Sequence, residues 1–101
     1  MAVMATEHRL AAERRVNDLI AVVRALPRHE HLTLMMEEAE NLARAIAAFH
    51  LEGIRFRMYN VDRMTTHTPV PLPVEVLTAV ADIHRHLEAA GFHTRSHQAP
   101  G

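Results

Sequence analysis

Apolar residues recur at helical spacing near the start of the chain, with charged residues between them. Five of them alternate at spacings of four and three residues: Ala12, Val16, Leu19, Val23 and Leu26. This spacing places them on one face of a helix. Thr6 is a suitable N-cap, and Pro27 ends the pattern because proline cannot continue a helix. The pattern therefore predicts a first helix over about residues 5–26.

Apolar residues at alternating spacings of four and three also occur in the middle of the chain, where they extend over a longer segment. One stripe runs through Met35, Ala39, Leu42, Ile46, Phe49, Gly53 and Phe56, and a second through Ala47, Leu51, Ile54, Met58 and Val61. With Thr33 as a cap, they predict a central helix over about residues 32–66, roughly 50 Å long at 1.5 Å per residue. A compact domain of this size has a radius of gyration of only about 13 Å, so the two apolar faces would need a partner chain.

A proline-rich connector, residues 65–73, separates the central helix from the last one. Its three prolines at alternate positions exclude a helix and favour an extended path. Beyond it the spacing predicts a helix over about residues 74–90, whose buried face would carry Val76, Val80, Ile83, Leu87 and Ala90. Gly91 is suited to end this helix in the left-handed conformation. The polar residues 93–101 are expected to form a mobile tail.

A second interpretation breaks the central helix at Gly53. Residues 54–58 alternate apolar and polar, which is the period of a strand. The result would be a small α+β domain with strands near 54–60 and 92–96. Only 4% of the residues are aromatic, and such a composition suits close packing of helices better than sheet faces. We therefore expect one all-α domain over residues 1–101, with three helices, assembled as a dimeric bundle through the long central helix.

Composition narrows the functional classes. The 101 residues include no cysteine, which excludes disulfides and thiolate chemistry, and the net charge is −1. No apolar run approaches the roughly 20 residues needed to span a membrane. Glu7, His8 and Arg9 stand where a signal peptide would be apolar, so we expect a cytoplasmic protein. No segment carries the concentrated basic face that nucleic acids require, so nucleic acid is not an expected partner.

Nine histidines suggest one alternative function. Histidine changes its charge near pH 6.5 and is a common metal ligand, so the second alternative function is a metal or pH sensor. His84 and His86 are two residues apart, and in a helix they point away from one another. Those two side chains therefore cannot hold one ion together, and a metal site would have to combine several helices.

An acidic group near the start of the central helix suggests another alternative. Glu37 and Glu40 can share a helix face, and Asp82 could pack beside them to hold Mg²⁺ with a substrate's phosphates. The segment 34–46, LMMEEAENLARAI, resembles the second helix of MazG-type nucleotide pyrophosphohydrolases. That resemblance implies an all-α, dimeric, magnesium-dependent enzyme that hydrolyses nucleoside triphosphates. The motif of that family is Glu-Glu-x-x-Glu; its third acid falls on Asn41 here, with Glu40 one place early.

We favour a function without catalysis. The sequence contains no recognisable nucleophile machinery, and acidic residues in a first helical turn interact favourably with the helix dipole. The excess apolar surface of the central helix indicates an interaction or regulatory protein that self-associates, with another protein as a further candidate partner. Its association face would comprise Leu42, Ile46, Phe49, Gly53 and Phe56. No catalytic residue and no cofactor is assigned, and magnesium enters only under the enzyme alternative.

Overall fold

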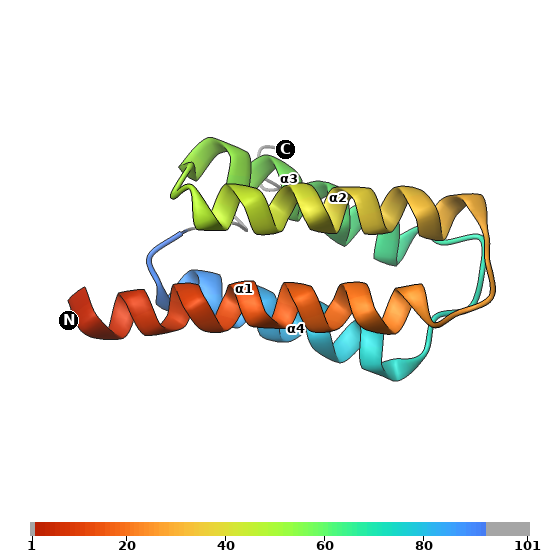
Figure 1. Cartoon of the computed structure of the whole chain (residues 1–101), viewed down its shortest axis with the longest axis horizontal. Helices are drawn as coiled ribbons and strands as arrows, with labels where there is room; N and C mark the ends of the chain where they lie inside the picture. Colours follow the sequence, from red (N-terminus) through yellow and green to blue (C-terminus); the bar gives the residue numbers. More distant parts are fainter. Residues whose placement is uncertain (1, 93–101) are drawn as a thin grey trace.

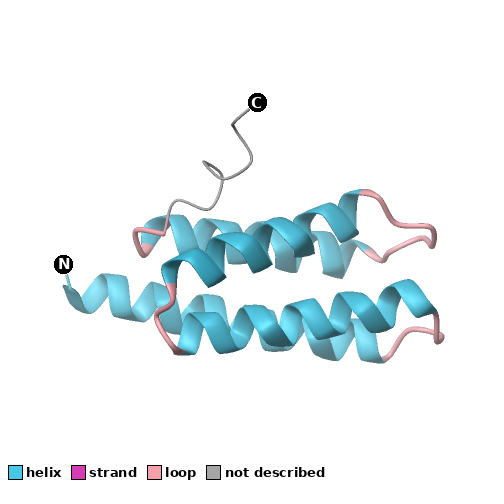
Figure 2. Cartoon of the chain, turned by 90° about the horizontal axis from the view of Figure 1, so that it is seen from above, coloured by secondary structure: helices cyan, strands magenta, loops and turns pink. Residues whose placement is uncertain are grey.

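Four helices make up the regular structure in the computed structural model (Figure 1), which describes residues 2–92 and side chains from residue 5 onward. They are α1 (Ala2–Arg24), α2 (Glu30–Ala47), α3 (Leu51–Thr66) and α4 (Val74–Ala89). Successive helices run in opposite directions, with α1 and α4 in one layer and α2 and α3 in the other (Figures 1 and 2). The all-α expectation is confirmed, whereas the expectation of three helices is wrong.

The first strand of the α+β alternative, expected near residues 54–60, is not formed. Residues 54–60 lie in α3, and no strand occurs between residues 2 and 92. Most of the second proposed strand, and the expected tail over residues 93–101, lie outside the described residues.

The predicted central helix is broken by a reversal of the chain at Phe49, whose φ is 60°. The amide of Phe49 donates to the carbonyl of Ile46 at 3.1 Å, and that of His50 donates to Ala45 at 3.0 Å. These two bonds form a Schellman motif, which usually places glycine at the left-handed position. His50 then caps α3, because its ring Nδ1 accepts from the amide of Gly53 at 2.9 Å. The chain therefore turns before Gly53 and continues as a helix.

Because of this reversal, each half of the predicted central helix buries a face within its own chain. The buried residues are Leu32, Met35, Ala39, Leu42 and Ile46 on α2, and Ile54, Met58 and Val61 on α3. The predicted faces of the outer helices are confirmed for Ala12, Val16, Leu19, Val23, Val76, Val80, Ile83 and Leu87, which are buried as well. Leu26 and Ala90, predicted to belong to the same faces, lie just past the ends of α1 and α4 and are only partly buried. The Cα radius of gyration of 12.9 Å and the largest extent of 41 Å exclude a helix of about 50 Å.

Two predicted helix starts are corrected. α1 begins at Ala2, so Thr6 lies inside the helix, because the preceding Ala-rich residues are good helix formers. α2 begins at Glu30 and is capped by His29, whose ring accepts from the amide of His31 at 3.0 Å. Thr33 lies in the first turn, where its hydroxyl donates to the His29 carbonyl at 3.3 Å.

The residues that follow α2 and α4 meet at one end of the bundle. Gly91 (φ 97°) ends α4 as predicted, and the amide of Phe92 bonds back to the last turn. The rings of Phe49 and Phe92 pack with centroids 5.7 Å apart. Arg9 of α1 lies 4.7 Å from the Phe49 ring and donates to the Ile46 carbonyl at 3.4 Å. These contacts hold the α2–α3 reversal against α1 and α4.

The two layers are also joined by a polar contact between α3 and α4, the pair of packed helices with the least extensive contact. His84 of α4 is buried, and its Nε2 lies 3.5 Å from a carboxylate oxygen of Asp62 on α3. Because a buried polar group needs a partner, this contact helps to hold α3 and α4 together at this position.

The cap of α3 can be tested by substitution. His50→Ala should lower the free energy of unfolding by about 1 kcal/mol, because the Gly53 amide loses its acceptor at the start of the helix. His50→Asn keeps an acceptor at this position and should unfold close to wild type. Urea denaturation followed by circular dichroism measures both variants. Equal stability of His50→Ala and wild type would show that this cap does not support the reversal.

Candidate interaction surface

An open groove runs along the bundle between α2 and α3. Its sides carry residues at matching spacings, Leu34, Glu38, Asn41 and Ala45 on α2 and Gly53, Arg57, Asn60 and Met64 on α3. Two hollows of about 380 and 700 Å³ follow one another along it. A Cβ atom on Gly53 would lie 3.3 Å from that of Ala45, so the small residues allow the helices to approach closely at this end.

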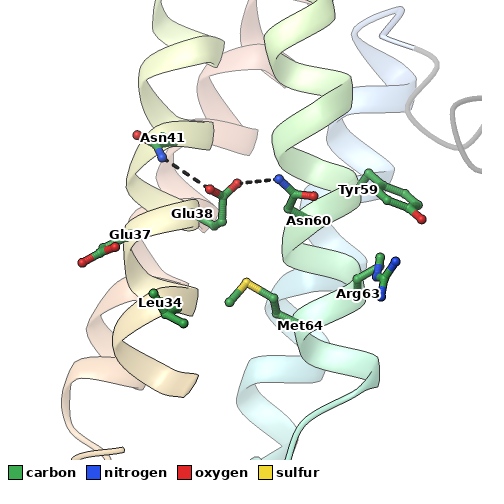
Figure 3. Close-up of a pocket in the computed structure, with 8 residues that line it drawn as sticks. All are labelled: Leu34, Glu37, Glu38, Asn41, Tyr59, Asn60, Arg63 and Met64. Carbon is green, nitrogen blue, oxygen red and sulfur yellow. Dashed lines mark hydrogen bonds between the residues drawn. The ribbon is translucent and has the colours of Figure 1, made fainter. Parts of the chain in front are cut away.

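Glu38 forms the polar centre of the groove (Figure 3). Its carboxylate accepts from Arg57 at 2.9 Å and from Asn60 at 3.0 Å, both on α3, and more distantly from Asn41 at 3.5 Å. The Glu38 side chain is only 18% exposed, so these bonds are partly shielded from water. They tie α2 to α3 and keep the carboxylate neutralised inside the groove.

Apolar side chains flank this polar centre and reach solvent. Leu34 of α2 is 48% exposed and Phe56 of α3 is 47% exposed. The guanidinium of Arg57 lies 5.0 Å from the centre of the Phe56 ring. The half-exposed ring thus has one cationic neighbour, while the rest of its surface remains available for contact.

Four charged residues stand on the ridges beside the groove. Glu37 and Arg44 are seven residues apart on α2, and Glu52 and Arg63 are eleven apart on α3, so each pair shares a helix face. Glu37 and Arg63 border one hollow from opposite sides, as Figure 3 shows, and Arg44 and Glu52 border the other. The signs therefore alternate both along each helix and across the groove. We call the surface formed by Leu34, Glu37, Arg44, Glu52, Phe56 and Arg63 the outer α2–α3 face.

Within residues 2–92, none of these four charges is held in a strong ion pair. Glu37 makes no ion pair or hydrogen bond with the side chains and backbone that the structure describes. Arg44 donates to the neutral Asn41, and Arg63 lies 5.9 Å from the ring of Tyr59. Glu52 pairs with Arg55 at 3.6 Å on an exposed helix surface, where such pairs contribute little. All four charges are exposed and can interact with another molecule.

The five residues of the association face predicted from the sequence do not form one surface: two are buried in the core, and the other three lie at different places on the bundle. Leu42 and Ile46 are fully buried in the core, because the helix break turns their face inward. Gly53 lies at the close approach of α3 to α2 within the chain. Phe49 is 61% exposed at the end of the bundle, and Phe56 is half-exposed on the outer α2–α3 face. Of the predicted face, only Phe56 belongs to this surface.

The three carboxylates predicted to hold magnesium are not brought together. Glu37 points to the outer surface of α2, whereas Glu40 lies toward α1, where it is 3.8 Å from Arg24. Asp82 is on α4, and α2 and α4 do not contact each other. Among the described residues, no group of three or more histidine or acidic side chains is placed to hold a metal ion.

Asp82 instead joins α4 to α1. Its carboxylate accepts from Arg85 at 2.7 Å and from Arg15 at 2.9 Å. The hydrogen bond from Arg85, followed by the effect of Arg15, lowers the pKa of Asp82. The pKa of Arg15 is raised, chiefly by its hydrogen bond to Asp18. Two guanidinium groups thus neutralise Asp82 and occupy its oxygens.

The structure adds a histidine pair that sequence reasoning missed. Nδ1 of His8 on α1 lies 3.0 Å from Nδ1 of His86 on α4, so one ring must donate and the other accept. Burial and then the charge of His8 lower the pKa of His86 below the usual 6.5, and Arg85 acts in the same direction. The residues are 78 positions apart, and only the antiparallel packing of the first and last helices brings them together.

Comparisons with protein-family models, with characterised proteins and with solved structures found no match to this chain. Between residues 2 and 92, none of the helices is both long and apolar enough to cross a membrane.

The groove network gives a stability prediction. Glu38→Gln should lower the free energy of unfolding by about 1–2 kcal/mol, because Arg57 loses a charged partner in a partly buried site. Glu37→Gln is the matched control on the adjacent position, and it should change stability by less than about 0.5 kcal/mol. Chemical denaturation of both variants distinguishes the two. Equal effects would contradict the role of Glu38 as the polar centre.

The histidine pair gives a pH prediction. Because the unfolded chain protonates His86 more readily than the folded chain, the stability contributed by its neutral form is present above about pH 6.5 and is lost as the pH falls toward the lower folded pKa. NMR titration of the His86 ring should give a midpoint below 6.5. His86→Gln should also lose less stability than wild type between pH 7.5 and 5.5. A midpoint at or above 6.5 would refute the prediction.

Proposed function

We propose that this protein is a small non-catalytic interaction module that self-associates through the outer α2–α3 face. The alternating arrangement of Glu37, Arg44, Glu52 and Arg63 carries this proposal. In a two-fold symmetric dimer the same surface meets itself, so each charge must lie opposite its complement. A face with charges of one sign would repel its own copy, whereas an alternating pattern does not.

Two orientations of the two-fold axis satisfy this requirement, and both lie in the plane of contact between the two copies: one parallel to the helices and one across them. With the axis parallel to the helices, Glu37 faces Arg63 of the partner subunit, and Arg44 faces Glu52 of the partner subunit. With the axis across the helices, Glu37 faces the partner's Arg44, and Glu52 faces the partner's Arg63. Both arrangements pair all four charges with opposite signs, which favours a second copy over an unrelated partner.

The apolar residues supply the remaining requirement for association. Phe56 and Leu34 are half-exposed beside the polar centre. Aromatic side chains are enriched among the interface residues that contribute most of the binding free energy. Exposed ion pairs each contribute at most about 1 kcal/mol, so the charges select the orientation while burial of the apolar residues provides affinity. The dimer should therefore be reversible and weaken as salt rises.

Light scattering and sedimentation velocity test the proposal. The wild-type mass should rise with concentration toward twice the chain's 11.4 kDa. Glu37→Arg should keep the protein at the mass of one chain, because a like charge then faces it in either arrangement. Double variants that exchange two charges within one chain identify the axis. Glu37→Arg combined with Arg63→Glu should restore association if the axis is parallel to the helices. Glu37→Arg combined with Arg44→Glu should restore it if the axis lies across the helices.

Glu7→Arg is the matched control, since it makes the same change in net charge on an exposed position of α1. It should associate as wild type does. A wild-type protein that keeps the mass of one chain at millimolar concentration would refute self-association. A dimer unaffected by both Glu37→Arg and Phe56→Asp would show that another surface is used.

A further inference from the structure

The two loops at the end of the bundle opposite Phe49 border a separate apolar hollow that opens to solvent. The connection between α1 and α2 meets the connection between α3 and α4, and a cavity of about 390 Å³ lies between them. Leu26, Leu32 and Val70 supply aliphatic walls, and all three pack against the hydrophobic core. A cavity of several hundred cubic ångströms with mostly apolar walls is typical of small-molecule sites.

The backbone around this hollow is constrained. Pro27 lies in one loop and Pro71 in the other, and both line the cavity. Proline fixes its own φ, so the walls lose little further conformational freedom when a ligand enters. A second hollow of about 330 Å³ shares Leu26 and Leu32 and extends the crevice toward Met36. An elongated apolar group could occupy this crevice.

The polar residues at the rim favour an anion. Arg28 is exposed, lines both hollows, and makes no ion pair or hydrogen bond with the residues that the structure describes. His29 accepts from the His31 amide through Nδ1, which leaves its Nε2 as the donor of the neutral ring. The positive end of the α2 dipole lies beside both residues, since that helix begins at Glu30.

From this combination we infer that the loop end of the bundle is a binding site for a small amphipathic anion. The apolar part of the ligand enters between Leu26 and Val70, and its carboxylate, sulfonate or phosphate group pairs with Arg28 at the rim. This site does not include any residue of the outer α2–α3 face, so it is independent of self-association.

Two fluorescent probes that share one ring system test the inference. The anion 8-anilinonaphthalene-1-sulfonate carries a sulfonate that neutral N-phenyl-1-naphthylamine lacks. The anion should bind saturably at one site per chain, and Arg28→Gln should weaken it by roughly threefold or more while leaving the neutral probe unchanged. Arg14→Gln, which removes an exposed arginine from α1, is the matched control and should bind the anion as wild type does.

Methyl NMR identifies where the probe binds. The anion should shift the methyl signals of Leu26 and Val70 and leave those of Leu34 unchanged, because Leu34 belongs to the outer α2–α3 face. The inference is overturned if the anion does not saturate, if it shifts Leu34 instead, or if Arg28→Gln binds it as tightly as wild type. Binding weakened equally by Arg14→Gln and Arg28→Gln would also overturn it, since only net charge would then matter.

Discussion

The left-handed conformation of Phe49 determines how the rest of the chain packs. A residue other than glycine in this conformation costs roughly 1–2 kcal/mol, so it persists only where neighbouring contacts compensate. Those contacts come from Arg9 on one side and Phe92 on the other, which are near opposite ends of the described chain. The turn between α2 and α3 is therefore stabilised by α1 and by the end of α4. The backbone reversal and the packing of the four helices therefore stabilise each other.

Much of the fold could be predicted from periodicity, because each helix buries one regularly spaced face. The stripe from Val76 to Leu87 and the stripe of α1 are both buried as expected. The reversal could not be predicted in this way, because the apolar spacing continues through it without interruption. Glycine usually marks such a position, but here Phe49 occupies it and Gly53 lies four residues later. The two stripes assigned to one long helix are the core faces of two short ones.

The candidate surface was predictable only in part. Spacing alone places Glu37 and Arg44 on one face of α2, and it places Glu52 and Arg63 on one face of α3. That these pairs flank one groove with alternating signs follows from antiparallel pairing, which requires the turn at Phe49. The carboxylates expected to gather around a metal face different neighbours for the same reason. Short-range spacing was informative, whereas the juxtaposition of α2 and α3 across the groove depended on one unpredicted turn.

A distance between the two ends of the α2–α3 hairpin tests this account most directly. The chain has no cysteine, so spin labels can be attached at Thr33→Cys and Thr66→Cys, two exposed positions, and diluted with unlabelled protein for pulsed electron resonance. With interaxial distances of about 10 Å between packed helices, the reversal predicts labels within about 20 Å of each other. A separation near 50 Å, the length of an unbroken helix between these positions, would contradict the account.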